Sequence, residues 1–269
     1  MNTNELRALA HATTAIVEAG RYVAPSGREV RIAESTAAAI AGTRLYRPGQ
    51  DAVVPVRASA APVIEVTNES SLSASRRLGD DVACLVFASA KNPGGGFLNG
   101  AQAQEESIAR VSALHACQAS APQFYEFHRQ QQDPRYSDRV IYSPRVTVFR
   151  GEDGTLLEEP YPVSFLTAAA PNLGAIFTSQ PAAAGSVPGV LATRAGRVLQ
   201  VAAAHGHRVL VLGAWGCGVF RNDPATVAQA FAGHLDRTAG WFDRVVFAVL
   251  DHQRGTPTYN AFARAFGSR

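Results

Sequence analysis

The run DVACLVFAS, residues Asp81–Ser89, constrains the fold more than any other stretch of this sequence. Its apolar side chains are nearly continuous instead of alternating with polar ones, as in a strand that is buried on both faces. Further strands are predicted at VIEVTN (Val63–Asn68), RVIYSPRVTVFR (Arg139–Arg150), YPVSFLTAAAPN, HRVLVLG and RVVFAVLD (Arg244–Asp251). Helical patterns separate them, at Glu69–Gly79, Gln104–Gln118, QFYEFHRQQ, Thr193–Gly206, Pro224–Arg237 and TPTYNAFARAFG. This alternation predicts an α/β fold, a central sheet covered by helices on both faces.

The first sixty residues differ from the remainder of the chain. Leu6–Glu18 and Val30–Ala41 are rich in alanine and repeat apolar residues at helical spacing. The small-residue segment RASAAP (Arg57–Pro62) then predicts a link to the α/β region. We therefore expect residues 1–61 to form a helical extension, packed on a core domain of residues 62–269.

Composition excludes several classes of protein. The 269 residues are 46% hydrophobic and 17% charged, which is typical of a globular chain and not of a disordered one. Net charge is only +3 and Lys91 is the single lysine, so the cations are nearly all arginines, which suit bidentate contacts with phosphates. Without a dense basic run, sequence-specific binding of nucleic acid is not expected, although the arginines leave a nucleic-acid-binding protein as a rival hypothesis.

The cysteines and the N-terminal segment indicate the compartment. Cys84, Cys117 and Cys217 are odd in number and lack metal-ligand spacing, so neither a disulfide framework nor a zinc site is predicted. The first twenty residues lack the basic start and apolar run of a signal peptide. Nothing approaches the roughly 20 apolar residues of a membrane span. We expect a cytoplasmic protein without a membrane association.

Two glycine-rich loops each follow a predicted buried strand, Asn92–Gly100 and Gly213–Gly218. In a sheet of this kind ligands gather at the carboxyl ends of the strands, so both loops are expected to open onto one crevice. Neither loop matches the P-loop or the dinucleotide fingerprint. Glycine loops still expose amides that bind anions, and a helix predicted at Pro224 would add a favourable dipole. The pair predicts a diphosphate cradle; the alternative is two tight turns with incidental glycines.

Glu105 and Glu106 follow the first loop, in the first turn of a predicted helix. The plain alternative is structural, because acidic residues at a helix start are stabilised by the dipole. Adjacent helical residues point about 100° apart, so one carboxylate can face a reacting bond while the other holds the substrate. Neighbours in sequence cannot bracket a sugar as the carboxylates of most glycosidases do. We assign one as acid/base and the other as a binding group.

At this point the sequence resembles a known family. GGGFLNGAQAQEE (Gly94–Glu106) is similar to the signature of poly(ADP-ribose) glycohydrolases, and GAWGCGVF (Gly213–Phe220) is similar to their diphosphate loop. The segment VTNESSLSASRRL resembles the bacterial type in particular. The resemblance covers about Val63 to the C-terminus. It implies a macrodomain-like three-layer α/β/α fold with a mixed central sheet, preceded by the N-terminal helical extension.

The resemblance also implies residue roles. Glu106 would be the catalytic acid, and Glu105 would hydrogen-bond the hydroxyls of the terminal ribose. Glu69 is implied for the adenine amino group, and Phe220 would pack beside the ribose. The other implied substrate-binding residues are Asn92, the close-approach glycines Gly94, Gly95 and Gly96, Gln104, the diphosphate-binding amides of Gly216, Cys217, Gly218 and Val219, and Phe247.

The implied reaction is exo cleavage of poly(ADP-ribose) that releases ADP-ribose, with ADP-ribosylated proteins as polymer carriers. It needs a proton on the departing oxygen and tolerance of an oxocarbenium-like centre. Glu106 must then hold a proton, a state that the neighbouring Glu105 charge or the diphosphate favours. No metal and no cofactor are implied. Two rivals with the same fold are a non-catalytic ADP-ribose reader and a hydrolase of mono-ADP-ribosylated protein or of a nucleotide metabolite.

Several other residues have ordinary structural explanations. Cys217 lacks an identifiable His or Asp partner for a nucleophile. His205 and His207 are expected at a helix cap or on the surface, and His252 at the rim of the pocket. Packing roles are expected for Trp215, Tyr259 and Phe262.

Overall fold

The computed structural model of the chain describes residues 1–269 apart from 51, 55–60, 80, 239 and 268–269. Its main sheet has seven strands in the order β3-β6-β7-β5-β8-β9-β4. Their bounds are β3 Arg44–Tyr46, β4 Val63–Thr67, β5 Val82–Phe87, β6 Val140–Arg150, β7 Leu156–Ala168, β8 Val209–Gly213 and β9 Arg244–Ala248. The pairs β3–β6 and β6–β7 are antiparallel and the others are parallel, so the sheet is mixed as expected.

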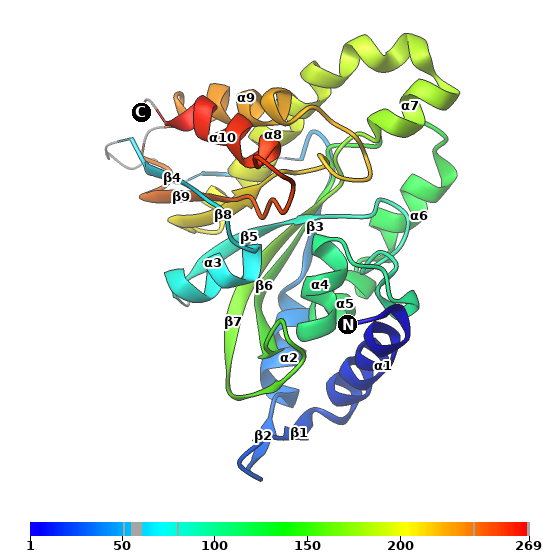
Figure 1. Cartoon of the computed structure of the whole chain (residues 1–269), viewed down its shortest axis with the longest axis vertical. Coiled ribbons are helices and arrows are strands. Elements are labelled where there is room, and N and C mark those ends of the chain that lie inside the picture. The colour runs from blue at the N-terminus through cyan, green and yellow to red at the C-terminus, as the bar shows by residue number, and fades with distance from the viewer. Residues whose placement is uncertain (51, 55–60, 80, 239, 268–269) are drawn as a thin grey trace.

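The central strand β5 is buried on both faces, as its sequence predicts. Val82, Cys84 and Val86 pack into one apolar cluster, with side chains from α3 (Ser71–Leu78), α4 (Gln104–Val111) and α5 (Leu114–Ala119). Ala83 and Leu85 pack into a second cluster, with α8 (Val187–Ala204), α9 (Pro224–Leu235) and α10 (Pro257–Phe266). Helices therefore cover both faces of the sheet (Figure 1), which confirms the predicted three-layer α/β/α fold.

The N-terminal segment is less purely helical than predicted. It contains α1 (Thr3–Ala19), a hairpin of β1 (Arg21–Val23) and β2 (Glu29–Arg31), α2 (Ala33–Gly42) and β3. The helix predicted from Val30 begins later, because residues 29–31 pair with β1 as a strand. β3 adds an edge strand to the main sheet beside β6. The domain boundary at residue 61 stays a prediction, and most of the predicted link lies outside the described residues.

α1 packs beside α4, the helix that carries the two glutamates (Figure 1). The Thr13 hydroxyl on α1 donates a hydrogen bond to the carbonyl of Arg110 on α4, at 2.5 Å. The Arg150 guanidinium at the end of β6 donates to the same hydroxyl at 3.1 Å. The first helix thus supports the back of the glutamate-bearing helix.

The helix predicted over Gln104–Gln118 is interrupted. α4 ends at Val111 and α5 begins at Leu114, because Ser112 pairs with Val148 of β6 and the Ala113 N–H donates to the Thr147 carbonyl at 3.0 Å. α6 (Pro122–Gln130) follows as expected. Three further elements were not predicted: α7 (Leu173–Ser179) and the short 3-10 helices η1 (Phe97–Asn99) and η2 (Pro181–Ser186).

Candidate active site

The two glycine loops lie side by side, because β5 and β8, the strands that precede them, are parallel neighbours in the sheet. Residues from both loops line a cavity of about 480 Å³, which we name the glutamate lobe because Glu105 and Glu106 line it. The prediction of a common crevice is confirmed. The other residues that line this lobe include Ser89, Lys91, Asn92, Tyr136, Gly216, Gly218, Val219 and Phe220.

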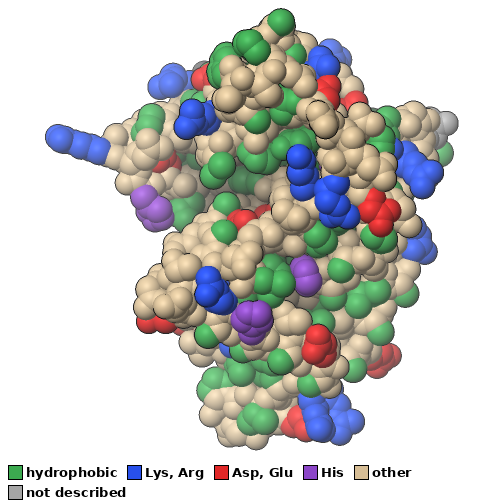
Figure 2. All heavy atoms as spheres, turned by 90° about the vertical axis from the view of Figure 1, so that its right-hand side faces the viewer, with side chains coloured by type: hydrophobic (Ala, Val, Ile, Leu, Met, Phe, Trp, Pro, Cys, Tyr) green, Lys and Arg blue, Asp and Glu red, His purple; other side chains and the backbone are tan. Residues whose placement is uncertain are grey.

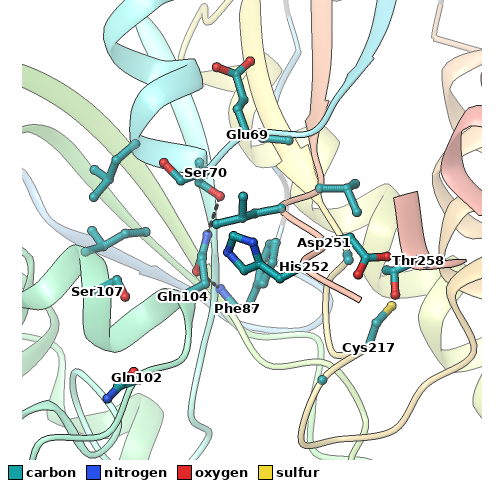
Figure 3. Close-up of a pocket in the computed structure, with 18 of the residues that line it drawn as sticks. Glu69, Ser70, Phe87, Gln102, Gln104, Ser107, Cys217, Asp251, His252 and Thr258 are labelled. Atoms are coloured by element: carbon teal, nitrogen blue, oxygen red, sulfur yellow. Dashed lines mark hydrogen bonds between the residues drawn. The ribbon is translucent and has the colours of Figure 1, made fainter. Parts of the chain in front are cut away.

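A second cavity of about 520 Å³ adjoins the first, and we name it the Asp251 lobe. Phe87, Gln104, Ala214 and Gly218 line both cavities, so the two form one continuous cleft. In Figure 3, Ser70 and Gln104 lie on one side of the Asp251 lobe, Asp251, Thr258 and Cys217 lie on the other, and His252 lies between them. The expected position of His252 at a pocket rim is confirmed.

Glu105 is held at both carboxylate oxygens. Its Oε2 accepts from the Ser89 N–H at 2.6 Å, and its Oε1 accepts from Gln118 Nε2 at 2.8 Å. The side chain is only 2% exposed. Burial raises the pKa of Glu105 to about 8, against the opposite pull of those two hydrogen bonds. A carboxyl group fixed in this way suits binding and orientation better than proton delivery.

Glu106 is held at one oxygen only. Its Oε1 accepts from the Gly96 N–H at 2.9 Å. Its Oε2 is buried and has no hydrogen-bond partner among the residues that the structure describes. A buried carboxyl oxygen without a partner is unfavourable, and a ligand hydroxyl or a departing oxygen would supply one. The two neighbours therefore differ: Glu105 is anchored at both oxygens, and Glu106 has an oxygen available to a ligand.

The triple glycine makes room for these carboxylates. A side chain at Gly95, where φ is +58°, would collide with Oε1 of Glu106. The amides of all three glycines are used inside the protein: Gly94 donates to Gln118, Gly95 to the Asn92 carbonyl and Gly96 to Glu106. These glycines can bring the main chain close to a ligand, but their N–H groups are already committed.

The second loop keeps amides available. The Cys217 N–H donates to the Ala214 carbonyl at 3.1 Å, so this amide is committed. The amides of Gly216, Gly218 and Val219 form no hydrogen bond with other described residues. Gly216 has a φ of +72°. The ring centroids of Phe220 and Tyr136 are 6.0 Å apart, and both residues line the glutamate lobe. Three of the four amides predicted to bind a diphosphate are thus unpaired and line the cleft or adjoin it.

Gln104 and Glu69 are tied into the frame of the cleft. Gln104 donates to the Leu85 carbonyl at 2.8 Å and to the Ser71 hydroxyl at 3.0 Å, and it accepts from the Phe87 N–H at 2.9 Å. It therefore fixes the start of α4 against the end of β5. Glu69 lines the Asp251 lobe, where its Oε1 accepts from Arg77 at 2.7 Å.

Phe247 does not belong to the cleft. Its side chain is fully buried, stacked on Phe266 with ring centroids 4.2 Å apart, and it lines neither lobe. Its position on β9 places it in the apolar layer under α9 and α10. The predicted binding role of Phe247 is corrected to packing.

The N-terminus of α9 is also not the phosphate site that the sequence suggested. Asp223 caps this helix, and its carboxylate accepts from the Thr226 N–H at 2.8 Å. A carboxylate of the protein thereby occupies the place of an anion. In the segment that precedes α9, a phosphate can therefore be bound by the main-chain amides of the second glycine-rich loop and not by the helix N-terminus.

The other tempting residues have structural roles. Trp215 is fully buried and donates to the Ala168 carbonyl at 2.9 Å, and Phe262 is in the core with Tyr259 packed against it. Burial raises the pKa of the Cys217 thiol to about 12, which opposes a nucleophilic role. The cap position expected for His207 is confirmed, because its N–H donates to the Ala202 carbonyl at 3.2 Å just beyond the end of α8, but the surface position is wrong. Its ring is 5% exposed, with Nε2 2.8 Å from the Tyr142 hydroxyl of β6.

Sequence reasoning missed Gln118, Ser89, Tyr136 and Asp251. Gln118 is fully buried and joins Glu105 to the Gly94 N–H. A polar residue on the face of α5 that also carries Leu114 and Cys117 was the signal that could have found it. Asp251 accepts from the Thr258 N–H at 2.7 Å and fixes the start of α10 beside the cleft. Its position directly after the last strand was a comparable signal.

Two kinds of feature are absent from the described part of the chain. No three His, Cys, Asp or Glu side chains there are grouped so as to hold a metal ion. No described helix combines the length and the apolar character that crossing a membrane requires.

The chain is similar to a known family of proteins and to solved structures. A family model described as microbial-type PARG, catalytic domain, matches residues 10–151, which include the triple glycine and both glutamates. Among solved structures, poly(ADP-ribose) glycohydrolase (PARG) from Thermomonospora curvata is 55% identical, with 98% of this chain and 100% of that chain covered and a TM-score of 0.92.

Two further structures carry ligands. The Thermomonospora curvata enzyme bound to the inhibitor ADP-HPD is 54% identical over 98% of this chain and 100% of that chain, with a TM-score of 0.89. The enzyme from Deinococcus radiodurans in complex with ADP-ribose is 47% identical over 89% of this chain and 99% of that chain, with a TM-score of 0.84. A comparison with curated proteins gave no match.

Proposed function

The chain belongs to the microbial-type poly(ADP-ribose) glycohydrolase family, and we propose that it hydrolyses the ribose–ribose O-glycosidic bonds of poly(ADP-ribose). It acts mainly from chain ends and releases ADP-ribose. The observation that carries this proposal is Glu106: one carboxyl oxygen is fixed by the Gly96 N–H, and the other is buried in the cleft with no partner among the described residues. An ADP-ribose reader needs a cleft but has no use for such an oxygen.

The dimensions of the cleft suit ADP-ribose. The glutamate lobe, about 480 Å³, receives the terminal ribose between Glu105 and Phe220. The unpaired amides of Gly216, Gly218 and Val219 bind the diphosphate. The Asp251 lobe, about 520 Å³, receives the adenosine, with Glu69 accepting from the adenine amino group. A relative is solved with ADP-ribose, in support of this assignment.

The two glutamates then divide the work. Glu105, held by Ser89 and Gln118, positions the ribose hydroxyls. Glu106 donates the proton on its Oε2 to the departing oxygen as the bond to the anomeric carbon breaks, and the bonding electron pair leaves with that oxygen. The diphosphate offsets the positive charge that develops on the sugar. The Glu106 carboxylate then takes a proton from water while the water oxygen bonds to the anomeric carbon.

The wider setting of the reaction is part of the same proposal. The polymer is carried by ADP-ribosylated proteins, whose remaining chains the enzyme shortens. We place the reaction in the cytoplasm, in keeping with Cys84, Cys117 and Cys217 as free thiols.

The test compares wild type with Glu106→Gln and Glu106→Ala. Each protein is incubated with purified poly(ADP-ribose), and ADP-ribose release is followed by chromatography. We expect Glu106→Gln to lose roughly 10²- to 10⁴-fold in rate, as for removal of a general acid, while its ADP-ribose affinity by calorimetry stays near that of wild type. Glutamine keeps the bond from the Gly96 N–H and cannot supply the proton.

The rival functions have their own outcomes. If wild type binds ADP-ribose but releases none from the polymer, the protein is a reader and the proposal fails. If wild type instead removes single ADP-ribose groups from modified proteins faster than it shortens polymer, the mono-ADP-ribosyl hydrolase is favoured.

A further inference from the structure

Two basic residues, of which one lines the glutamate lobe, are joined by a hydrogen bond. Lys91 lines this lobe together with Glu105 and Glu106, and its side chain is exposed. Arg129 on α6 is also exposed, and it donates to the Lys91 carbonyl at 2.7 Å. The segment is anchored to the catalytic centre, because the Lys91 N–H donates to the Ser89 hydroxyl and the Ser89 N–H donates to Glu105. The main chain of Lys91 and the Arg129 guanidinium are thus linked to Glu105 through Ser89.

No described carboxylate neutralises either cation. Within the described residues no carboxylate forms an ion pair with Lys91 or Arg129; Glu126 lies one turn earlier on α6 and forms no ion pair with Arg129. The face of the molecule in Figure 2 shows acidic side chains inside a hollow and basic side chains on the surface beside it. Two unpaired positive charges beside buried carboxylates indicate an anionic ligand outside the lobe.

Cations in the neighbouring cavity are different. Tyr136 lines both the glutamate lobe and another hollow, distinct from the Asp251 lobe. Arg135 and Arg194 also line this other hollow. Arg135 pairs with Asp133 at 2.6 Å, and Arg194 pairs with Asp138 at 2.9 Å. These guanidinium charges are already matched. The basic pair Lys91–Arg129 is therefore the better anion site on this side of the cleft.

The polymer carries an anion close to the reacting bond, outside the terminal unit. The departing oxygen belongs to the adenosine ribose of the next unit, and the same ribose carries that unit's diphosphate on its 5′ carbon. A diphosphate therefore lies one sugar ring beyond the oxygen that Glu106 protonates. Free ADP-ribose has no such group.

We propose that Lys91 and Arg129 form a subsite for the diphosphate of the adjacent polymer unit, which carries the departing oxygen. This subsite lies outside the pocket that holds the terminal unit. The subsite rests on the proposed function, since it assumes that the terminal ribose occupies the glutamate lobe. It makes the cleft selective for polymer over its own product, because ADP-ribose fills the cleft and leaves the basic pair unused. Release of the product is favoured accordingly.

The test measures binding in the Glu106→Gln background, so that no ligand is consumed. The ligands are ADP-ribose and the linear dimer of two ADP-ribose units, titrated by calorimetry. Exposed ion contacts are weak, so we expect the dimer to bind about three- to tenfold more tightly than ADP-ribose. With Lys91→Gln and Arg129→Gln added, the dimer should bind no more tightly than ADP-ribose. The Kd for ADP-ribose should stay unchanged within about twofold. The ratio should also fall as salt rises from about 50 to 500 mM.

A matched control removes the same charge elsewhere. Arg21→Gln with Arg31→Gln, on the β1–β2 hairpin, should keep the dimer preference. A preference that survives in the Lys91/Arg129 variant overturns the subsite, and so does an equal loss of affinity for both ligands. Turnover with the native Glu106 separates the two proposals. If wild type cleaves no polymer but the dimer preference depends on the basic pair, the proposed function fails, and the basic pair is a polymer-binding site of a reader instead of a subsite for a departing unit.

Discussion

A Cβ atom on Gly95 would lie 2.3 Å from Oε1 of Glu106, far closer than the 3.0 Å below which Cβ contacts essentially never occur. The same oxygen accepts from the Gly96 N–H at 2.9 Å. Glycine at position 95 therefore opens the space that lets the helix deliver Glu106 against the loop. The φ of +58° at Gly95 adds a second reason for glycine there, since other residues rarely adopt it.

Gly95→Ala should separate activity from stability. The new methyl group meets the far end of a flexible side chain, so Glu106 can swing away, and the free energy of unfolding should fall by only about 1 kcal/mol, mostly from the positive φ. Displacement of the carboxyl group should lower kcat at least roughly 100-fold. Urea unfolding and initial rates of ADP-ribose release measure the two effects.

A matched control for Gly95→Ala is Gly233→Ala on α9, where a Cβ meets nothing within 4 Å. It should match wild type in rate. An active Gly95→Ala would show that Glu106 needs no fixed position.

Gln118→Met should weaken both the fold and the site. Methionine keeps the length of the side chain but leaves the Gly94 N–H and Oε1 of Glu105 without their partner. Buried groups that lose a partner cost about 1–3 kcal/mol, and we expect a comparable fall in the free energy of unfolding. Because Glu105 loses its orientation, KM for polymer should rise. Gln131→Met, at an exposed position, is the control. A Gln118→Met variant with the wild-type free energy of unfolding and KM would rule out the positioning role.

Stability should depend on the ionisation of Glu105. Burial raises its folded pKa to about 8 from the ordinary 4.5, so between these values the folded protein holds a proton that the unfolded chain has lost. The contribution is complete below about pH 4.5 and is lost as pH rises toward 8. In Glu105→Gln this loss should disappear. Urea unfolding at several pH values compares the two slopes; equal slopes would mean that Glu105 is ionised throughout.

The sheet and the crevice could be predicted because their signals are local and repeated. The apolar runs of β5 and β8 are each followed by a glycine-rich loop, and the parallel pairing of these strands brings the two loops together. The wrong start at Val30 and the missed β3 have one cause. Strands such as β2 and β3 are each only 3 residues long, too short for a period, and their pairing partners decide them.

Contacts between distant side chains limited the prediction of the site. Nothing near Glu105 in the sequence indicates that Gln118, from the next helix, would hold it. The break between α4 and α5 depends on β6, which pairs with Ser112. Phe247 was misplaced for a related reason, since residues of a buried strand alternate between two faces and its ring is on the face under α10.

Gly216→Ala should behave in the opposite way to Gly95→Ala. A Cβ at Gly216 would lie 2.5 Å from the Cβ of Ala170 and 2.6 Å from Nδ2 of Asn222. The Asn222 side chain donates hydrogen bonds to the Pro171 and Gly216 carbonyls, so it cannot move freely away from a new methyl group. With φ at +72°, we expect a loss of about 2–4 kcal/mol in the free energy of unfolding, together with weaker ADP-ribose binding as the diphosphate loop shifts. Gly218→Ala, where a Cβ meets nothing within 4 Å, is the control for stability. If Gly216→Ala unfolds at the wild-type urea concentration, the loop is not held rigidly by Ala170 and Asn222, and its amides are not preorganised for a diphosphate.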